Sequence, residues 1–117
     1  MSLRVLVTIP ELAQEFCAAP KVEARGGDAL LKFDFEREDG SYGFTGILFE
    51  GCVKSRFTAE ARMTRTEDIH AYNAVAVEET SDWTEGSGLF HYKVFFDGFG
   101  LYEFAAASFV KLGELEA

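Results

Sequence analysis

The chain has 117 residues, of which 48% are hydrophobic and 15% aromatic, and its formal net charge is −9. A single domain of this length buries roughly two-thirds of its unfolded surface, so it can fold without metals or crosslinks. No apolar run approaches the roughly 20 residues that cross a bilayer, and the first residues lack the long apolar stretch of a signal peptide. We therefore expect one cytoplasmic domain over residues 1–117, without membrane association.

The two cysteines, Cys17 and Cys52, have no second cysteine or histidine near them in the sequence. Without a secretory signal, such residues are more often reduced thiols than a disulfide framework. We expect both to act as small apolar side chains rather than as redox or nucleophilic groups.

The negative charge is concentrated in the second half of the chain. Residues 1–58 carry seven basic and nine acidic side chains, a net charge of −2, whereas residues 59–117 carry four and eleven, a net charge of −7. No Lys or Arg lies between Arg65 and Lys93. This distribution argues against nucleic-acid binding, because affinity for phosphates depends on Lys and Arg. The acidic stretch is either a solvated rim or a docking face for a basic protein, and its candidate partner-binding residues are Glu78, Glu79, Asp82 and Glu85.

The N-terminal segment, residues 1–20, combines a short strand with a short helix. Residues 3–7 are apolar enough for a strand, and residues 10–18 place their apolar side chains at helical spacing between Pro10 and Pro20. We expect this two-turn helix to depend on docking against a sheet.

From residue 21 to residue 112 the pattern predicts an antiparallel sheet. Apolar and polar residues alternate over residues 31–36 and 52–58, and residues 42–49 between them form a further strand in which Gly43 and Gly46 mark a weak point or a bulge. Turns are expected at residues 38–41 and at Glu50-Gly51. Phe-Glu-Gly at residue 49 and Phe-Asp-Gly at residue 96 suggest two similar hairpins, although so short a match also arises by chance.

Residues 59–88 are ambiguous. Thr64 and Glu67 fit a capping box, which favours a helical turn over residues 64–70, and residues 71–79 alternate like a strand. A helix through residues 69–76 remains an alternative. Residues 82–85 favour a further helical turn, and Gly86-Ser87-Gly88 a flexible link.

The strongest local signal is the hairpin over residues 89–112. Asp97-Gly98 between aromatic runs favours a two-residue type I′ turn, which would place Val94 opposite Leu101 and Tyr92 opposite Glu103. Both faces of this hairpin are apolar, so each must be covered, and we expect a homodimer through this sheet or its edge. Residues 113–117 are expected to fray.

Together these elements predict an α+β domain that is mostly β. An antiparallel meander sheet curls into a barrel or a two-layer sandwich, with one or two short helices.

No constellation of residues identifies a catalytic site. His70 and His91 lack metal-binding spacing, and Ser87 lacks the GxSxG environment of a nucleophile, so we expect no metal, no cofactor and no catalytic residue. Asp34 and Glu103 are acids on otherwise apolar strands, which is typical either of a functional carboxylate or of a hydrogen-bonded core acid. The candidate ligand-binding residues are His91, Tyr92, Tyr102, Glu103 and His70.

Two classes of function are consistent with this pattern. The first is a non-enzymatic acidic protein that acts by protein–protein interaction, through self-association or a basic partner. The second is a small-ligand-binding barrel, or an enzyme, with an aromatic-lined cavity. A filled aromatic core favours the first class and a Phe-lined cavity the second.

Overall fold

The computed structural model describes residues 3–9, 19–59, 74–79, 81–96 and 99–115. These residues form strands and turns, with no helix among them. The strands are β1 (Leu3–Thr8), β2 (Lys21–Arg25), β3 (Asp28–Glu36), β4 (Tyr42–Glu50), β5 (Lys54–Ala59), β6 (Ala74–Glu78), β7 (Phe90–Phe96), β8 (Gly100–Ala106) and β9 (Ser108–Lys111).

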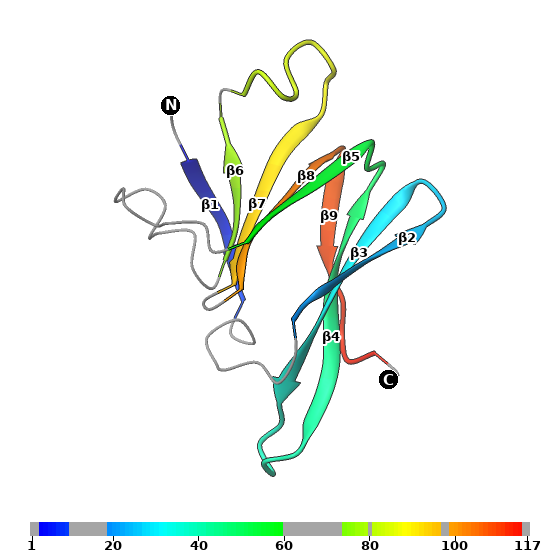
Figure 1. Ribbon diagram of the computed structural model, residues 1–117, viewed down its shortest axis with the longest axis vertical. Helices are drawn as coiled ribbons and strands as arrows, with labels where there is room; N and C mark the ends of the chain where they lie inside the picture. The colour runs from blue at the N-terminus through cyan, green and yellow to red at the C-terminus, as the bar shows by residue number, and fades with distance from the viewer. Residues whose placement is uncertain (1–2, 10–18, 60–73, 80, 97–98, 116–117) are drawn as a thin grey trace.

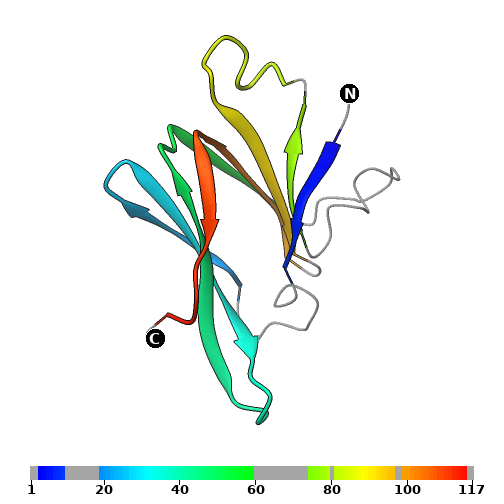
Figure 2. The same ribbon diagram turned by 180° about the vertical axis from the view of Figure 1, so that it is seen from behind.

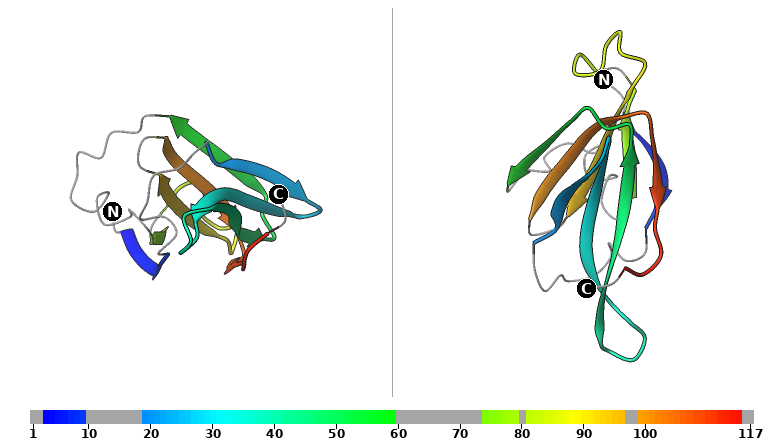
Figure 3. Two further views of the ribbon diagram at one scale, coloured as in Figure 1. Left: turned by 90° about the horizontal axis from the view of Figure 1, so that it is seen from below. Right: turned by 90° about the vertical axis from the view of Figure 1, so that its right-hand side faces the viewer.

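The strands form two antiparallel sheets that pack face to face. One sheet has the order β1-β6-β7-β8-β5 and the other β2-β3-β4-β9 (Figure 1). The view from below shows them as two layers (Figure 3). The predicted antiparallel, sheet-based fold is confirmed, and it is a sandwich rather than a closed barrel. The helix predicted over residues 10–18 and the helical turn at residues 64–70 lie outside the described residues.

An aromatic core fills the space between the sheets. Phe33 and Phe49 from one sheet and Phe96 and Phe104 from the other are fully buried. The rings of Phe49 and Phe104 stack across the interface with centroids 4.0 Å apart. Burying each such side chain contributes roughly 2–3 kcal/mol, so these contacts hold the two sheets together.

The predicted hairpin is present, but with its register shifted by one residue. Val94 lies opposite Tyr102 instead of Leu101, and Phe96 lies opposite Gly100. Three residues, 97–99, therefore connect the strands instead of two; Asp97 and Gly98 themselves lie outside the described residues. Because side chains alternate between the two faces of a strand, this shift moves Glu103 from the face of Tyr92 to that of Lys93.

The second predicted hairpin is wrong. Strand β4 belongs to one sheet and β5 to the other, so the chain crosses between sheets after Glu50. The predicted last strand also crosses, because β8 ends at Ala106 and β9 pairs with β4. The two crossings are hydrogen-bonded to each other, from the N–H of Ala107 to the carbonyl of Glu50 at 2.9 Å. Local alternation predicts strands but not the sheet that each one joins.

Three smaller regions resolve open alternatives or differ from expectation. Residues 74–78 form strand β6, which favours the strand over the helix there. Residues 82–85 form turns rather than a helix. Residues 113–115 are not frayed, since the N–H of Leu115 bonds to the carbonyl of Phe44 at 2.7 Å; Figure 2 shows this C-terminal stretch beside the four-stranded sheet.

Candidate functional site

A buried ion-pair network lies on the outer face of the five-stranded sheet. His91 on β7 and Glu103 on β8 lie diagonally across the hairpin, with their side chains only 6% and 5% exposed. The Nε2 of His91 lies 2.6 Å from the Oε2 of Glu103. Ions and polar groups in such a position are retained only when they are paired, because desolvation disfavours them.

Arg56 on the edge strand β5 completes this network. It lies directly opposite Glu103 and donates two hydrogen bonds to the carboxylate, from Nε and from a terminal nitrogen, each 2.9 Å long. Burial by itself would raise the pKa of Glu103, but the hydrogen bonds from His91 and Arg56, and their charges, lower it to about 2. Glu103 is therefore a carboxylate at neutral pH and a structural anchor.

The network also holds the segment of residues 81–89, which connects β6 to β7. The Oγ of Ser81 lies 2.7 Å from the Nδ1 of His91 and accepts a hydrogen bond from the N–H of Trp83. The Trp83 ring meets the His91 ring edge-on, with centroids 4.6 Å apart. The cationic groups of Lys54 and Arg56 lie over the same indole at 4.9 and 4.7 Å. This segment is thus attached to β5 and β7 through side chains.

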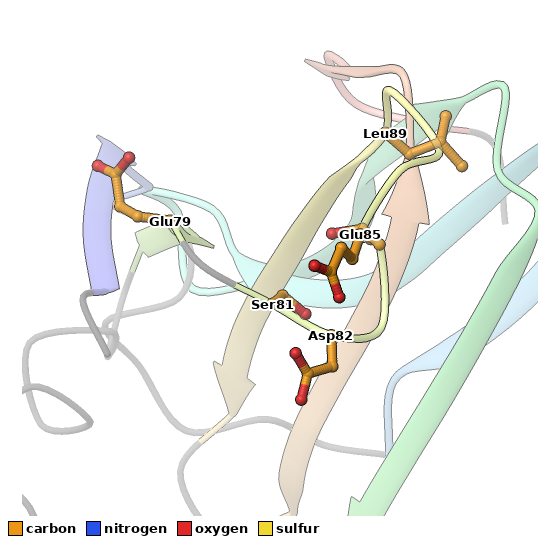
Figure 4. Close-up of a pocket in the computed structure, with 6 residues that line it drawn as sticks. Glu79, Ser81, Asp82, Glu85 and Leu89 are labelled. Atoms are coloured by element: carbon orange, nitrogen blue, oxygen red, sulfur yellow. The ribbon is translucent and has the colours of Figure 1, made fainter.

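A depression of about 440 Å³ lies on this segment, and three acidic residues line it. We call it the acidic depression; it is lined by Glu79, Ser81, Asp82, Thr84, Glu85 and Leu89. Figure 4 shows Ser81, Asp82 and Glu85 together on the arched segment, whereas Glu79 lies apart at the end of β6. Asp82 and Glu85 are exposed, and Glu79 forms an ion pair with Arg4 of β1.

The fourth acidic candidate, Glu78, does not belong to this surface. It is only 6% exposed, so the predicted solvated rim does not include it. Lys93 donates a hydrogen bond of 3.4 Å to its Oε2. Its Oε1 is buried and has no hydrogen-bond partner among the described residues. Glu78 is a charge inside the sheet's covered outer face rather than a contact for a partner.

The structure separates the candidate ligand-binding residues. His91 and Glu103 lie together on the outer face, whereas Tyr92 and Tyr102 point into the core between the sheets. Tyr102 donates its hydroxyl proton to the carbonyl of Pro20 at 2.9 Å. Burial raises the pKa of both tyrosines. The four candidates that the structure describes lie on opposite faces of the sheet and do not form one site; His70 lies outside the described residues.

The side chains of Ser81, His91 and Glu103 are linked in series, as are the nucleophile, base and acid of a serine-hydrolase catalytic triad. Their surroundings oppose acyl transfer, however. The oxygen of Ser81 already accepts a hydrogen bond from Trp83. Asp82 and Glu85 line the same depression, so an oxyanion formed there would face two carboxylates. No group of three or more His, Cys, Asp or Glu residues suited to a metal ion occurs in the part of the chain that the structure describes.

Sequence reasoning missed Arg56, Ser81 and Trp83. Arg56 reaches Glu103 because β5 pairs with β8, a contact over 47 residues that no local pattern reveals. The one available signal is Trp83, which is the only tryptophan of the chain and lies inside a polar, acidic stretch. A large aromatic residue in such a stretch indicates a segment that packs on something.

Comparison with protein-family models, with curated proteins and with solved structures finds no match to this chain. No helix in the described ranges has the length and apolar character needed to cross a membrane.

Proposed function

We propose that this protein works by binding a basic protein partner, and that the acidic depression receives a Lys or Arg side chain of that partner. The observation that carries the proposal is a depression of about 440 Å³ lined by the exposed carboxylates of Asp82 and Glu85, with Glu79 at its far side. A hollow lined by carboxylates suits an elongated cationic side chain, which binds through charge and hydrogen bonds together.

The attachment of the segment supports this proposal. Ser81 and Trp83 fix the segment to the sheet through His91, Lys54 and Arg56. A surface that is already held in place loses less conformational entropy when a partner binds. The buried network therefore serves the depression by positioning it, without touching the partner.

The charge distribution supports the same partner class. The chain has a net charge of −9, and no Lys or Arg lies between Arg65 and Lys93. Such a field accelerates encounter with a cationic surface and slows encounter with an anionic one. Of the three acids, Asp82 and Glu85 should contribute most, because Glu79 is already paired with Arg4.

Isothermal titration calorimetry with a hexa-lysine peptide at low ionic strength tests the proposal. We expect the double variant Asp82→Asn, Glu85→Gln to bind about tenfold more weakly, since it loses two charge-assisted contacts. Binding should also weaken steeply as salt is added.

The matched control removes the same charge from the far end of the molecule. Glu36→Gln, Glu38→Gln changes two acids at the turn between β3 and β4, opposite the 81–89 segment in Figure 1. This variant should bind hexa-lysine within about twofold of the original protein, because separations beyond a Debye length are screened. Equal losses in both variants, or no binding by the original protein, would rule out the depression as the site.

Self-association is the second mode of interaction that we propose, through the edges of the five-stranded sheet, one of the two surfaces expected from the sequence. Phe95 on the outer face of the hairpin is only 5% exposed, and the inner face packs in the core except at Phe90, which is 49% exposed. Most of both hairpin faces is therefore covered within one chain. The sheet edges remain. Phe57 on edge strand β5 is 48% exposed, and Val5 on edge strand β1 is 40% exposed. Sedimentation of the Phe57→Lys and Val5→Lys variants at micromolar concentration tests whether either edge pairs two copies.

A further inference from the structure

An exposed aromatic residue borders the acidic depression. Leu89 lines the depression, and Phe90 follows it as the first residue of β7. Figure 4 shows Leu89 on the same arched segment as Glu85. Phe90 is exposed, whereas residues 91–96 of the same strand are buried or half-buried. The depression and the exposed ring therefore meet at one end of β7.

The ring of Phe90 is held by the aromatic core beneath it. Its centroid lies 5.9 Å from that of Tyr92, which in turn lies 5.2 Å from that of Phe109. Tyr92 belongs to the buried core between the sheets. Phe90 is thus the exposed end of a continuous group of rings. An aromatic side chain that is already fixed loses little conformational entropy when a partner covers it, and such residues often carry much of the binding energy of an interface.

Val53 extends the apolar surface at this end of the sheet, and its side chain is also exposed. Its N–H donates a hydrogen bond of 2.9 Å to the carbonyl of Ala105, and Phe90 is the cross-strand partner of Ala106. Strands β5 and β7 flank β8, so Val53 and Phe90 lie on either side of the end of β8. We call these two residues the apolar patch. Single exposed apolar residues are common, but two that lie together beside a binding depression are typical of an interface.

The charge beside the apolar patch decides which partner covers it. Asp82 and Glu85 are exposed carboxylates at the same end of the molecule. Two copies of this chain that met through this end would bring these carboxylates together, and like charges in contact are repelled. A cationic segment is attracted instead, and an apolar side chain next to its cation would cover the patch.

We propose that the basic partner inferred above carries a large apolar side chain next to its Lys or Arg, and that this side chain packs on Phe90 while the cation enters the acidic depression. This mode of recognition rests on the proposed function and adds an apolar requirement to it. Leu89 and Phe90 are consecutive, with Cα atoms about 3.8 Å apart, so a segment that crosses the end of β7 reaches both surfaces.

Two peptides of equal length and charge, KKKFKKK and KKKSKKK, test the apolar requirement by isothermal titration calorimetry at low ionic strength. We expect KKKFKKK to bind about five- to tenfold more tightly, because its ring removes the exposed part of Phe90 from water. Added salt should weaken both peptides and leave their ratio unchanged, since only the charge contacts are screened. Equal affinities would overturn the apolar requirement and leave the basic partner standing, whereas no binding of either peptide would overturn both.

Variants of the full chain locate the contact. Phe90→Ser should abolish the preference for KKKFKKK and keep the affinity for KKKSKKK, and Phe90→Leu should retain part of the preference. The matched control is Tyr42→Ser, because Tyr42 is 46% exposed and Phe90 49%, and Tyr42 begins β4 at the opposite end of the molecule in Figure 1. This control should keep the full preference. Circular dichroism checks that each variant is folded. A preference that survives in folded Phe90→Ser, or that is lost in folded Tyr42→Ser, would overturn the assignment to Phe90.

Discussion

The structure contains two glutamates that each receive two hydrogen bonds from one arginine, one on the five-stranded sheet and one beside the four-stranded sheet, and the two pairs differ in burial. Arg56 binds Glu103 in the five-stranded sheet, where the glutamate is 5% exposed. Arg37 binds Glu114 beside the four-stranded sheet, where the glutamate is 46% exposed. The arginine lowers the pKa of both carboxyls, but only Glu103 also contacts a buried histidine.

We expect burial, rather than hydrogen-bond geometry, to decide how much such a pair contributes to the stability of the fold. An exposed pair exchanges its contacts with water at little net gain. A buried carboxylate that loses its partners cannot be rehydrated, so the surrounding structure depends on it. We therefore expect the Arg56–Glu103 pair to support the fold and the 81–89 segment, and the Arg37–Glu114 pair to contribute little beyond attaching the C-terminal residues.

The largest effect should come from Glu103→Ala. This change leaves His91 buried without its acceptor and Arg56 without its carboxylate, and should lower the free energy of unfolding by about 3 kcal/mol. Urea denaturation followed by circular dichroism measures it. Glu103→Gln keeps the volume and one acceptor, so it should cost less; a loss below about 1 kcal/mol for the alanine variant would contradict the role of burial.

Acid should break the same pair in the unaltered protein. The pKa of Glu103 is about 2 in the folded chain, against 4.5 for an ordinary glutamate, so folding favours its charged form. The resulting stability is fully present above about pH 5 and is lost as the pH falls towards 2. We expect a loss on the order of 2 kcal/mol, because the half-exposed Arg56 is partly screened. Urea midpoints between pH 6 and pH 3 should fall less in Glu103→Gln than in the original protein.

Trp83→Ala tests the link between the buried network and the acidic depression. It removes the indole that lies against Lys54, Arg56 and His91, and should cost ~1 kcal/mol of stability. The affinity for hexa-lysine should fall two- to threefold, since the depression is no longer held in place. If stability fell but the affinity for hexa-lysine did not change, the buried network would not be needed to position the acidic depression.

Glu114→Ala should give the smallest effect and so sharpens the comparison. The urea midpoint should be nearly unchanged at pH 7, because the pair is exposed and screened. Hydrogen exchange at the amide of Leu115 should accelerate, since that residue bonds to Phe44 next to the lost ion pair. A destabilisation as large as that of Glu103→Ala would show that hydrogen-bond geometry alone, and not burial, decides how much an Arg–Glu pair contributes to stability.

The fold could be predicted further than the candidate site. Alternation over residues 31–36 and 52–58 identifies β3 and β5, because a half-buried strand needs that period. Asp97-Gly98 between aromatic residues identifies the β7–β8 hairpin. Its register could not be fixed to a single residue, since two- and three-residue connections share the same turn residues. That one residue decides whether Glu103 faces the core or faces His91.

The sequence by itself determined most of the strands, but not β2 or the break between β8 and β9, together with the antiparallel hairpin and the acidic character of the stretch around residues 78–85. These depend on local periodicity and composition, which do not require knowledge of distant contacts. Only the tertiary structure decided that β5 leaves β4 to pair with β8, and this places Arg56 against Glu103. It also decided that Glu78 is buried while Asp82 and Glu85 share a depression. The physical reason is that an ion pair or a cavity is formed by residues distant in sequence, and their meeting depends on how the sheets close.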